Sequence, residues 1–529
     1  MRFVARAGRL AGITLIAGLL LASCDKGPDR TKVAADLQKS VEDYLAQIEG
    51  PADKRTLSHA SVLVTPQQDT GYLVAIDGLK LAQDAEGYLD IGKISYVLTP
   101  KDDQTYSADK LSVATDIPFK TADGQSAGGV KFTNKAFSGV WLRAAESFIK
   151  LDLQFADIDV KDIKQGDDLK MAGITLSSDS TDKGSGRWDQ LGKLTITGFS
   201  AAEDNGSRLD MASIDITSAI QGLKLLDYTA KLKAMRQAAV QPAAASSAGG
   251  TAGAADTATG NATTGDVTKP AGTTDAAANP AAAPIEEFIK ALPGLLTGST
   301  IDLHMNGVAY KDAGGQSAFE LAKVGVAATV AGFDQPKSTF KLTIDHDGLV
   351  LHTPEAETDF AKASLPGNGA LTVSLIDLPT ADLVSTLADG ASAYATADPT
   401  QIDAKTALFV AKFQQLLQQD GVKLKIEPSH LTSATANLTA DGDFVLQPAA
   451  IYGATGGLNI AITGIDQMMA LAQKEAGQNP AAAQAAGMLQ ALLAYAAREQ
   501  GSDGKPVDRF KVDVPQSGQV TVNGKPLQF

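Results

Sequence analysis

Cysteine is nearly absent from this chain of 529 residues, which contains Cys24 and no other. A single thiol cannot form an intramolecular disulfide, and it leaves no second thiol for unwanted bridging in an oxidising compartment. Aromatic residues are also scarce, at 5% of the sequence. This scarcity disfavours stacking platforms for sugars or bases.

Basic residues are fewer than acidic ones. The chain has 46 basic and 61 acidic residues, a formal net charge of -15. Residues 1–23 contain three arginines and no acid, so the remainder carries 43 basic residues against 61 acidic ones, or -18. Such a surface repels nucleic acid and anionic head groups. We therefore exclude nucleic acid as a partner, and we do not expect the protein to bind a membrane by charge.

The first residues have the order of a lipoprotein signal peptide. Three arginines precede the apolar stretch Leu10–Leu21, and the small residues Ala22 and Ser23 come directly before Cys24. Twelve apolar residues span about 18 Å as a helix, short of the roughly 30 Å hydrocarbon core that an uncleaved anchor must cross. The pattern predicts a signal peptide over residues 1–23, with Cys24 as the lipid acceptor.

Lipid on Cys24 would anchor the mature chain permanently, because each buried methylene contributes about 0.8 kcal/mol. Residues 24–30 then form a short tether. Asp25, directly after the cysteine, resembles the signal that keeps lipoproteins of enteric bacteria in the inner membrane. We expect the protein at the periplasmic face of a membrane in the cell envelope, with the inner membrane favoured.

Length and composition predict two regions. A chain of 529 residues exceeds one ordinary core. Residues 237–284 consist mainly of Ala, Gly, Thr, Ser and Pro, which cannot bury enough apolar surface to offset their ordering entropy. We expect a disordered linker there, between an N-terminal β-rich region over residues 31–236 and a C-terminal one over residues 285–529.

The predicted fold is mainly β with helices (α+β), a long antiparallel meander of curved sheets. Apolar residues alternate with polar ones in many short runs, the pattern of half-buried strands. Eleven Asp-Gly and Asn-Gly pairs, which tolerate the positive φ of hairpin turns, punctuate the runs. Helices are expected from Thr31, over residues 285–292, 400–419 and 481–499.

Two internal repeats are visible. The first reads apolar, small, Lys or Ser, apolar, any, apolar, and predicts a strand that is kinked at the small residue. Its copies are Ile91–Tyr96, Leu191–Ile196, Met211–Ile216, Leu321–Val326 and, more loosely, Ala108–Val113.

The second repeat relates residues 371–390 to residues 458–477 at one constant offset. Each copy is predicted to be a strand, a short turn and a helix closed by a glycine, Gly390 or Gly477. Chance similarity between β-rich segments is the alternative explanation.

The lipoprotein signal, these repeats and the ending Gly518–Leu527 resemble an uncharacterised alphaproteobacterial envelope family, known as a domain of unknown function. The chain is also similar to YdgA-like proteins. The resemblance implies repeated antiparallel sheet, distantly similar to AsmA-type envelope proteins with apolar grooves for lipid. It implies no activity and no catalytic residue, and the long linker departs from it.

One short motif has the form of a hydrolase nucleophile. Gly124–Gly128 reads G-x-S-x-G around Ser126, but that chemistry needs a sharp turn between a buried strand and a helix. The flanks here are polar and indicate a hairpin tip, so we expect no catalytic role for Ser126. Of the two tryptophans, we expect Trp141 and Trp188 to be core or strand-face residues.

Five histidines are available for metal binding. Three of them, His304, His346 and His352, have aspartates nearby, but no HExxH or comparable ligand spacing is present. We predict surface histidines, no metal, no cofactor and no enzymatic activity.

The remaining function is binding. A curved meander with one apolar face could hold lipid or another hydrophobic ligand, with the helices near 400–419 and 481–499 as a lid or simply as core. The alternative is a structural or assembly partner that binds another envelope protein. The sequence does not identify the ligand-binding residues.

Overall fold

The computed structural model describes residues 30–49, 57–68, 70–84, 87–145, 147–162, 167–203, 205–240, 282–353, 356, 358–395, 402–418, 421–502 and 504–527. The predicted signal peptide, Cys24 and Asp25 lie outside the described residues, as does most of the predicted linker.

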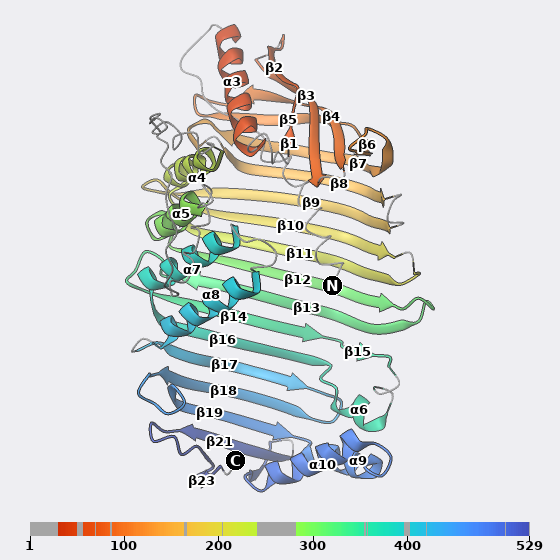
Figure 1. The fold of residues 1–529 in the computed structure, drawn as a ribbon, viewed down its shortest axis with the longest axis vertical. Coiled ribbons are helices and arrows are strands. Elements are labelled where there is room, and N and C mark those ends of the chain that lie inside the picture. Colours follow the sequence, from red (N-terminus) through yellow and green to blue (C-terminus); the bar gives the residue numbers. More distant parts are fainter. Residues whose placement is uncertain are drawn as a thin grey trace, which may run out of the picture.

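The described chain forms one antiparallel sheet with helices along its margins (Figure 1). The strands of the N-terminal part are β1 Leu57–Ser58, β2 Ser61–Pro66, β3 Tyr72–Asp84, β4 Gly87–Pro100, β5 Thr105–Val113, β6 Asp116–Thr121, β7 Ser126–Leu142, β8 Ser147–Asp162, β9 Asp167–Gly184, β10 Arg187–Ala202 and β11 Arg208–Leu223. Those of the C-terminal part are β12 Gly298–Lys311, β13 Ser317–Ala331, β14 Lys337–Asp347, β15 Val350–Leu351, β16 Asn368–Pro379, β17 Lys423–Thr432, β18 Asn437–Leu446, β19 Ala454–Thr463, β20 Ala497–Gln500, β21 Pro506–Val514, β22 Thr521–Val522 and β23 Lys525–Pro526.

Apart from α3, which precedes the first strand, the helices occupy connections between strands. They are α3 Arg30–Glu49, the 3-10 turn η3 Arg143–Ala145, α4 Leu225–Val240, α5 Ala282–Leu295, α6 Asp359–Ser364, α7 Thr380–Ala395, α8 Ile402–Leu417, α9 Ile465–Glu475 and α10 Pro480–Leu493. The expected mainly β fold with helices is therefore confirmed. Of the helices foreseen from sequence, the one expected over 481–499 ends at Leu493, and Ala497–Gln500 pair with β21 instead.

The sheet continues directly from the N-terminal to the C-terminal part. Strand β11 pairs with β12 from Arg208↔Lys311 to Gln221↔Gly298, although residues 241–281 separate the flanking helices α4 and α5. From β7 to β19 the main ladder then follows chain order, with β15 to one side (Figure 1). The two sequence regions thus share one sheet.

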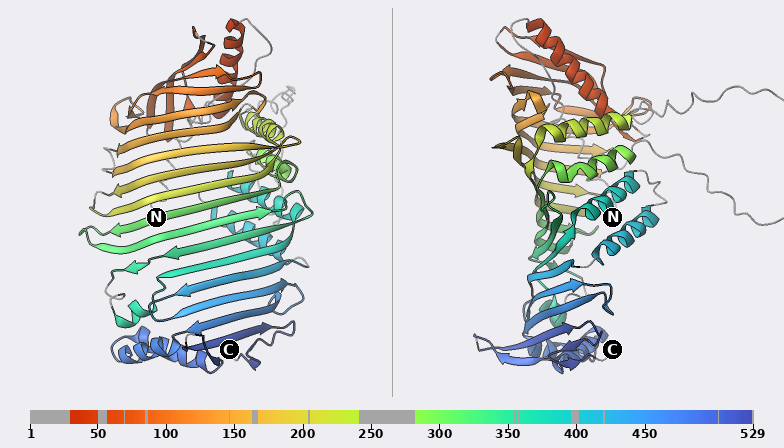
Figure 2. Two further views of the ribbon diagram at one scale, coloured as in Figure 1. Left: turned by 180° about the vertical axis from the view of Figure 1, so that it is seen from behind. Right: turned by 90° about the vertical axis from the view of Figure 1, so that its left-hand side faces the viewer.

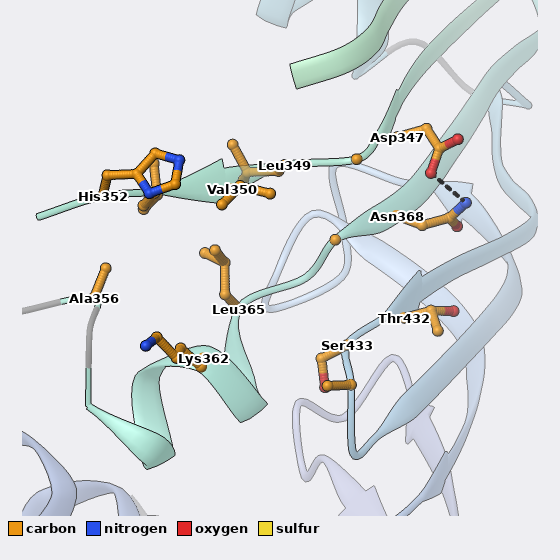
Figure 3. Close-up of a pocket in the computed structure, with 14 residues that line it drawn as sticks. Asp347, Leu349, Val350, His352, Ala356, Lys362, Leu365, Asn368, Thr432 and Ser433 are labelled. Atoms are coloured by element: carbon orange, nitrogen blue, oxygen red, sulfur yellow. Dashed lines mark hydrogen bonds between the residues drawn. The ribbon is translucent and has the colours of Figure 1, made fainter. Parts of the chain in front are cut away.

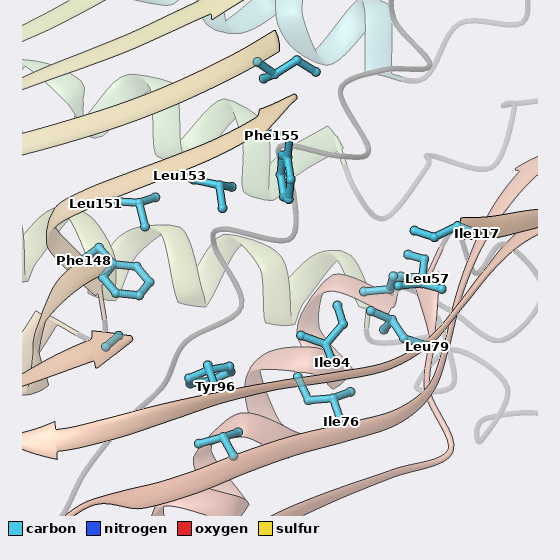
Figure 4. Packing of buried hydrophobic residues seen from close by; sticks show 14 of the residues in the cluster. Leu57, Ile76, Leu79, Ile94, Tyr96, Ile117, Phe148, Leu151, Leu153 and Phe155 are labelled. Carbon is cyan, nitrogen blue, oxygen red and sulfur yellow. The ribbon is translucent and has the colours of Figure 1, made fainter. Parts of the chain in front are cut away.

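The main core lies at the N-terminal end. Helix α3 buries Leu37, Val41 and Leu45, as its spacing of apolar residues predicts. These side chains join residues of β2 to β11 in one cluster. Figure 4 shows Leu153 and Phe155 of β8 facing the strands that carry Ile76 and Ile94. Trp141 is 1% exposed within this cluster, so its core assignment is confirmed.

A row of irregular backbone positions, which we call the crease, crosses the six strands β8 to β13 and ends at Gly348, directly after β14. Successive partners in one transverse row alternate between a residue with positive φ and an alanine. The row is Asp157, Ala172, Gly198, Ala212, Gly307, Ala322 and Gly348. A Cβ added at Gly307 would lie 2.8 Å from the Cβ of Ala212, so the crease needs glycine for both conformation and space.

The crease shows where the kink predicted for the first repeat lies, and in most copies this differs from the prediction. In the copies at 211–216 and 321–326, the small residue is an alanine of the crease, and the kink falls on the facing Gly307 or Gly348. Gly92 itself has positive φ, as predicted. The kink predicted in the copy at 191–196 is wrong, because its residues pair regularly with β9 and β11.

The second repeat is confirmed in its strand and helix, and it has a third copy. Residues Gly222, Asp377 and Gly464 each have positive φ. Each is followed by an apolar residue that is at most 1% exposed, and a helix begins within the next three residues. Gly390 does not close its helix. It lies inside α7, where an added Cβ would approach Phe409 of α8 to 2.6 Å.

Candidate functional site

One face of the sheet carries a long aliphatic row. Cross-strand partners on this face form an unbroken aliphatic row over eight strands. The row is Leu153, Leu176, Leu194, Ile216, Leu303, Val326, Ile344 and Leu371. Eight strands at a spacing of about 4.8 Å make this row about 34 Å long.

Burial changes along the row. Leu153 is 3% exposed because the N-terminal core covers it, whereas Val326, Ile344 and Leu371 are 37%, 44% and 48% exposed. Ile301, in the adjacent row, is 54% exposed. We call the exposed central part the apolar floor, made of Ile301, Leu303, Met305, Val324, Val326, Ala328, Leu342, Ile344, Leu371 and Val373. Contiguous exposed apolar surface of this kind marks an interaction site more often than scattered residues do.

Helices border the floor on one side. Ile220 and Val330 pack against α4 and α5, and Phe340, Leu375 and Leu424 pack against α7 and α8. Figure 2, in its right-hand view, shows these four helices standing on one side of the sheet. The crease borders the floor on the other side, where Met211 and Val308 belong to the main core. The helices at 402–417 and 480–493 complete cores at the margins, and within the described residues neither covers the floor.

The opposite face is polar and makes internal contacts. Threonine hydroxyls pair across strands, Thr300 with Thr329 and Thr343 with Thr372, each at 3.1 Å. Lys341 Nζ donates to Glu427 Oε2 at 2.7 Å. This bond, with a second one from the Ser374 hydroxyl, lowers the pKa of the Glu427 carboxyl. The two faces of the same strands therefore differ sharply in chemistry.

A pocket of about 640 Å³ lies at the strand ends, where β15 diverges from β16 (Figure 3). Leu349, Val350 and Leu365 form apolar parts of its wall, and Lys362 and Ser433 contribute polar groups. The pocket is open and its lining is mixed, without a converging set of acid, base and nucleophile.

The sequence candidates for catalysis do not assemble. Ser126 is the exposed first residue of β7, in a hairpin where it pairs with Lys120. The strand–turn–helix context of a nucleophile is therefore missing.

Two of the Asp-Gly and Asn-Gly pairs do not lie in the predicted hairpin turns. Asn306-Gly307 lies in the crease, and Asp441-Gly442 lies inside β18.

The histidines lie apart from one another. His304 Nε2 is 2.8 Å from Asp302 Oδ1, His346 Nε2 is 3.1 Å from the carbonyl of Pro366, and His352 is 3.6 Å from Glu320. Among the described residues, no three His, Cys, Asp or Glu side chains gather as a metal site. Trp188 packs beside α4 as a strand-face residue.

Sequence reasoning found the strands of the floor but not the floor itself. The alternation at Ile301–Met305, Phe340–Ile344 and Leu371–Leu375 predicts which side chains share a face. Whether that face is covered depends on the neighbouring helices, whose positions alternation does not encode.

No helix in the described part of the chain is both long and apolar enough to cross a membrane. No protein-family model, no curated protein and no solved structure matches the chain, so the family resemblance stays a prediction.

Proposed function

We propose that this protein is a membrane-tethered, non-catalytic lipoprotein that binds the acyl chains of a lipid on its apolar floor. The observation that supports this most directly is the exposed aliphatic floor, whose four most exposed residues are 37–54% exposed. Lipid bound there would bury this surface, at roughly 25 cal/mol per Å².

The composition of the floor favours acyl chains over a protein partner. Protein interfaces usually take their energy from Trp, Tyr and Arg anchors. The ten floor residues are aliphatic or Met, and none carries a hydrogen-bonding side chain. The polar neighbours on this face, Ser218 and His346, lie at the edges of the floor, so its interior suits a ligand that has no polar groups along its length.

The first test replaces one floor residue. Ile344→Glu places a carboxylate between Val326 and Leu371, its cross-strand neighbours. We expect lipid that co-purifies from membranes to fall at least tenfold. Because Ile344 is 44% exposed, the melting temperature of the variant protein should differ little from that of the unmodified protein. Native mass spectrometry after gentle detergent extraction measures the bound lipid.

Thr343→Glu is the matched control, since it puts the same charge one residue away on the polar face. Lipid retention should survive in this variant. Equal retention by both variants and the unmodified protein would contradict binding on the floor. A protein captured by the floor in place of lipid would support the alternative role as an envelope assembly partner.

The anchor is tested separately. We expect Cys24→Ser to prevent lipid attachment, so that nearly all of the protein moves from the membrane pellet to the soluble fraction, because acylation supplies the membrane affinity. Asp25→Ser would then redistribute the anchored protein if Asp25 acts as the inner-membrane signal. Immunoblots of separated inner and outer membranes measure both outcomes. A pellet unchanged in Cys24→Ser would refute the lipid anchor.

A further inference from the structure

The apolar face is interrupted at both ends of the floor. Toward the N-terminus, the same face is buried in the core, where Leu153, Phe155 and Ile174 are 3–5% exposed. Toward the C-terminus, Ile460 and Ile462 pack beneath Leu489 and Leu493 of α10. A ligand that moved along the sheet would have to displace one of these packed cores.

Polar groups add to the closure at the C-terminal end. From Gly369 the face continues through Leu431 of β17 and Leu438 of β18 to Ile462. The row through Ile462 ends on Asp508 of β21. Asp508 is 1% exposed and is held by Arg498 at 2.8 Å. An acyl chain would gain nothing by extending past these residues.

The dimensions of the open region match a small number of acyl chains. From β12 to β16 the four strands of the floor span about 14 Å, and Ile301 to Met305 span about 13 Å along a strand. One leaflet of a bilayer core is about 15 Å deep. Two chains lying across the strands, side by side, would therefore fill the floor.

Other occupants fit less well. Residues 241–281, which connect α4 to α5 in the sequence, contain one valine and no leucine, isoleucine or aromatic residue. A second copy of the mature chain would bring a net charge of -18 against another -18, which opposes face-to-face association.

We infer that the floor holds one diacyl lipid at a time and does not pass lipids along the sheet. This inference rests on the proposed function. It adds the number of lipids bound per chain and the boundaries of the lipid site on the sheet. It makes the protein a holder of single lipid molecules, filled and emptied through the open side of the floor.

The test uses the full-length, detergent-extracted protein and dioleoyl phosphatidylethanolamine. Native mass spectrometry over a lipid titration should reach a plateau at one lipid per chain. In parallel, a benzophenone-bearing amino acid is placed at Ile344 on the floor, or at Ile462 beneath α10. We expect the crosslinking yield at Ile344 to exceed that at Ile462 at least tenfold.

The outcomes separate the two proposals. Two or more lipids bound at saturation, or equal crosslinking at both positions, would overturn the single-lipid inference and leave lipid binding intact. No bound lipid at any concentration would overturn the proposed function as well. The titration uses the unmodified chain, so it decides the matter even if the Ile462 variant fails to fold. A mass peak of the dimer without bound lipid, in the same native mass spectra, would assign the floor to a second copy of the chain.

Discussion

Gly307→Ala should destabilise the protein by about 3 kcal/mol, one of the largest losses expected from adding a single methyl group. Gly307 has φ of +59°, a conformation that costs a residue with a Cβ about 1–2 kcal/mol. Its new Cβ would also lie 2.8 Å from that of Ala212, which forces β11 and β12 apart. Chemical denaturation followed by circular dichroism measures the change.

Two further variants separate conformation from contact. Gly315 has φ of +77° but nothing within 4 Å of an added Cβ, so Gly315→Ala should cost only about 1 kcal/mol. Adding Ala212→Gly to Gly307→Ala removes the contact and should recover part of the loss. If the Gly307 and Gly315 variants lose equal stability, close packing at the crease is not the cause.

Arg498→Met should cost about 3–5 kcal/mol, the usual result of leaving a buried charge without its partner. Arg498 donates to both oxygens of Asp508, at 2.8 and 3.0 Å, and to Asp466 at 2.9 Å. Asp508 is 1% exposed on the apolar side of β21, so its carboxylate cannot turn to water. These bonds also raise the pKa of the Arg498 guanidinium.

The double variant Arg498→Met with Asp508→Asn provides the control, because it removes the unpaired charge as well. It should be more stable than Arg498→Met alone. Hydrogen exchange of β19 to β21 locates the effect. A single variant as stable as the unmodified protein would show that the pair contributes little.

Much of the fold is predictable from local patterns. Alternating residues such as Phe340, Leu342 and Ile344 identify strands because side chains on a strand point to opposite faces. The spacing of Leu37, Val41 and Leu45 identifies α3 for the corresponding helical reason. The constant offset between residues 371–378 and 458–465 predicts a repeated strand and helix, and the structure contains both copies.

The errors have one physical origin. Asn306-Gly307 and Asp347-Gly348 were expected in hairpin turns, because positive φ is commonest there. Here the same conformation recurs on alternate strands of the crease, opposite an alanine each time, which depends on the register of partners far apart in sequence. The pairing of β11 with β12 across residues 241–281 is non-local in the same way. The floor was predictable as a set of strand faces, and its exposure was not.

The pairing of strands in chain order also determines where local unfolding of the sheet begins. Across the main ladder, each strand bonds chiefly to its chain neighbours, so stability approximates a sum of nearest-neighbour terms, as in repeat proteins. Fraying should then begin at the two ends and progress inward. Strands β12 to β16 lie near the middle, and their amides should exchange with solvent last. The apolar floor is thus carried by the strands farthest from both fraying ends, and the proposed lipid would load and leave without any strand opening.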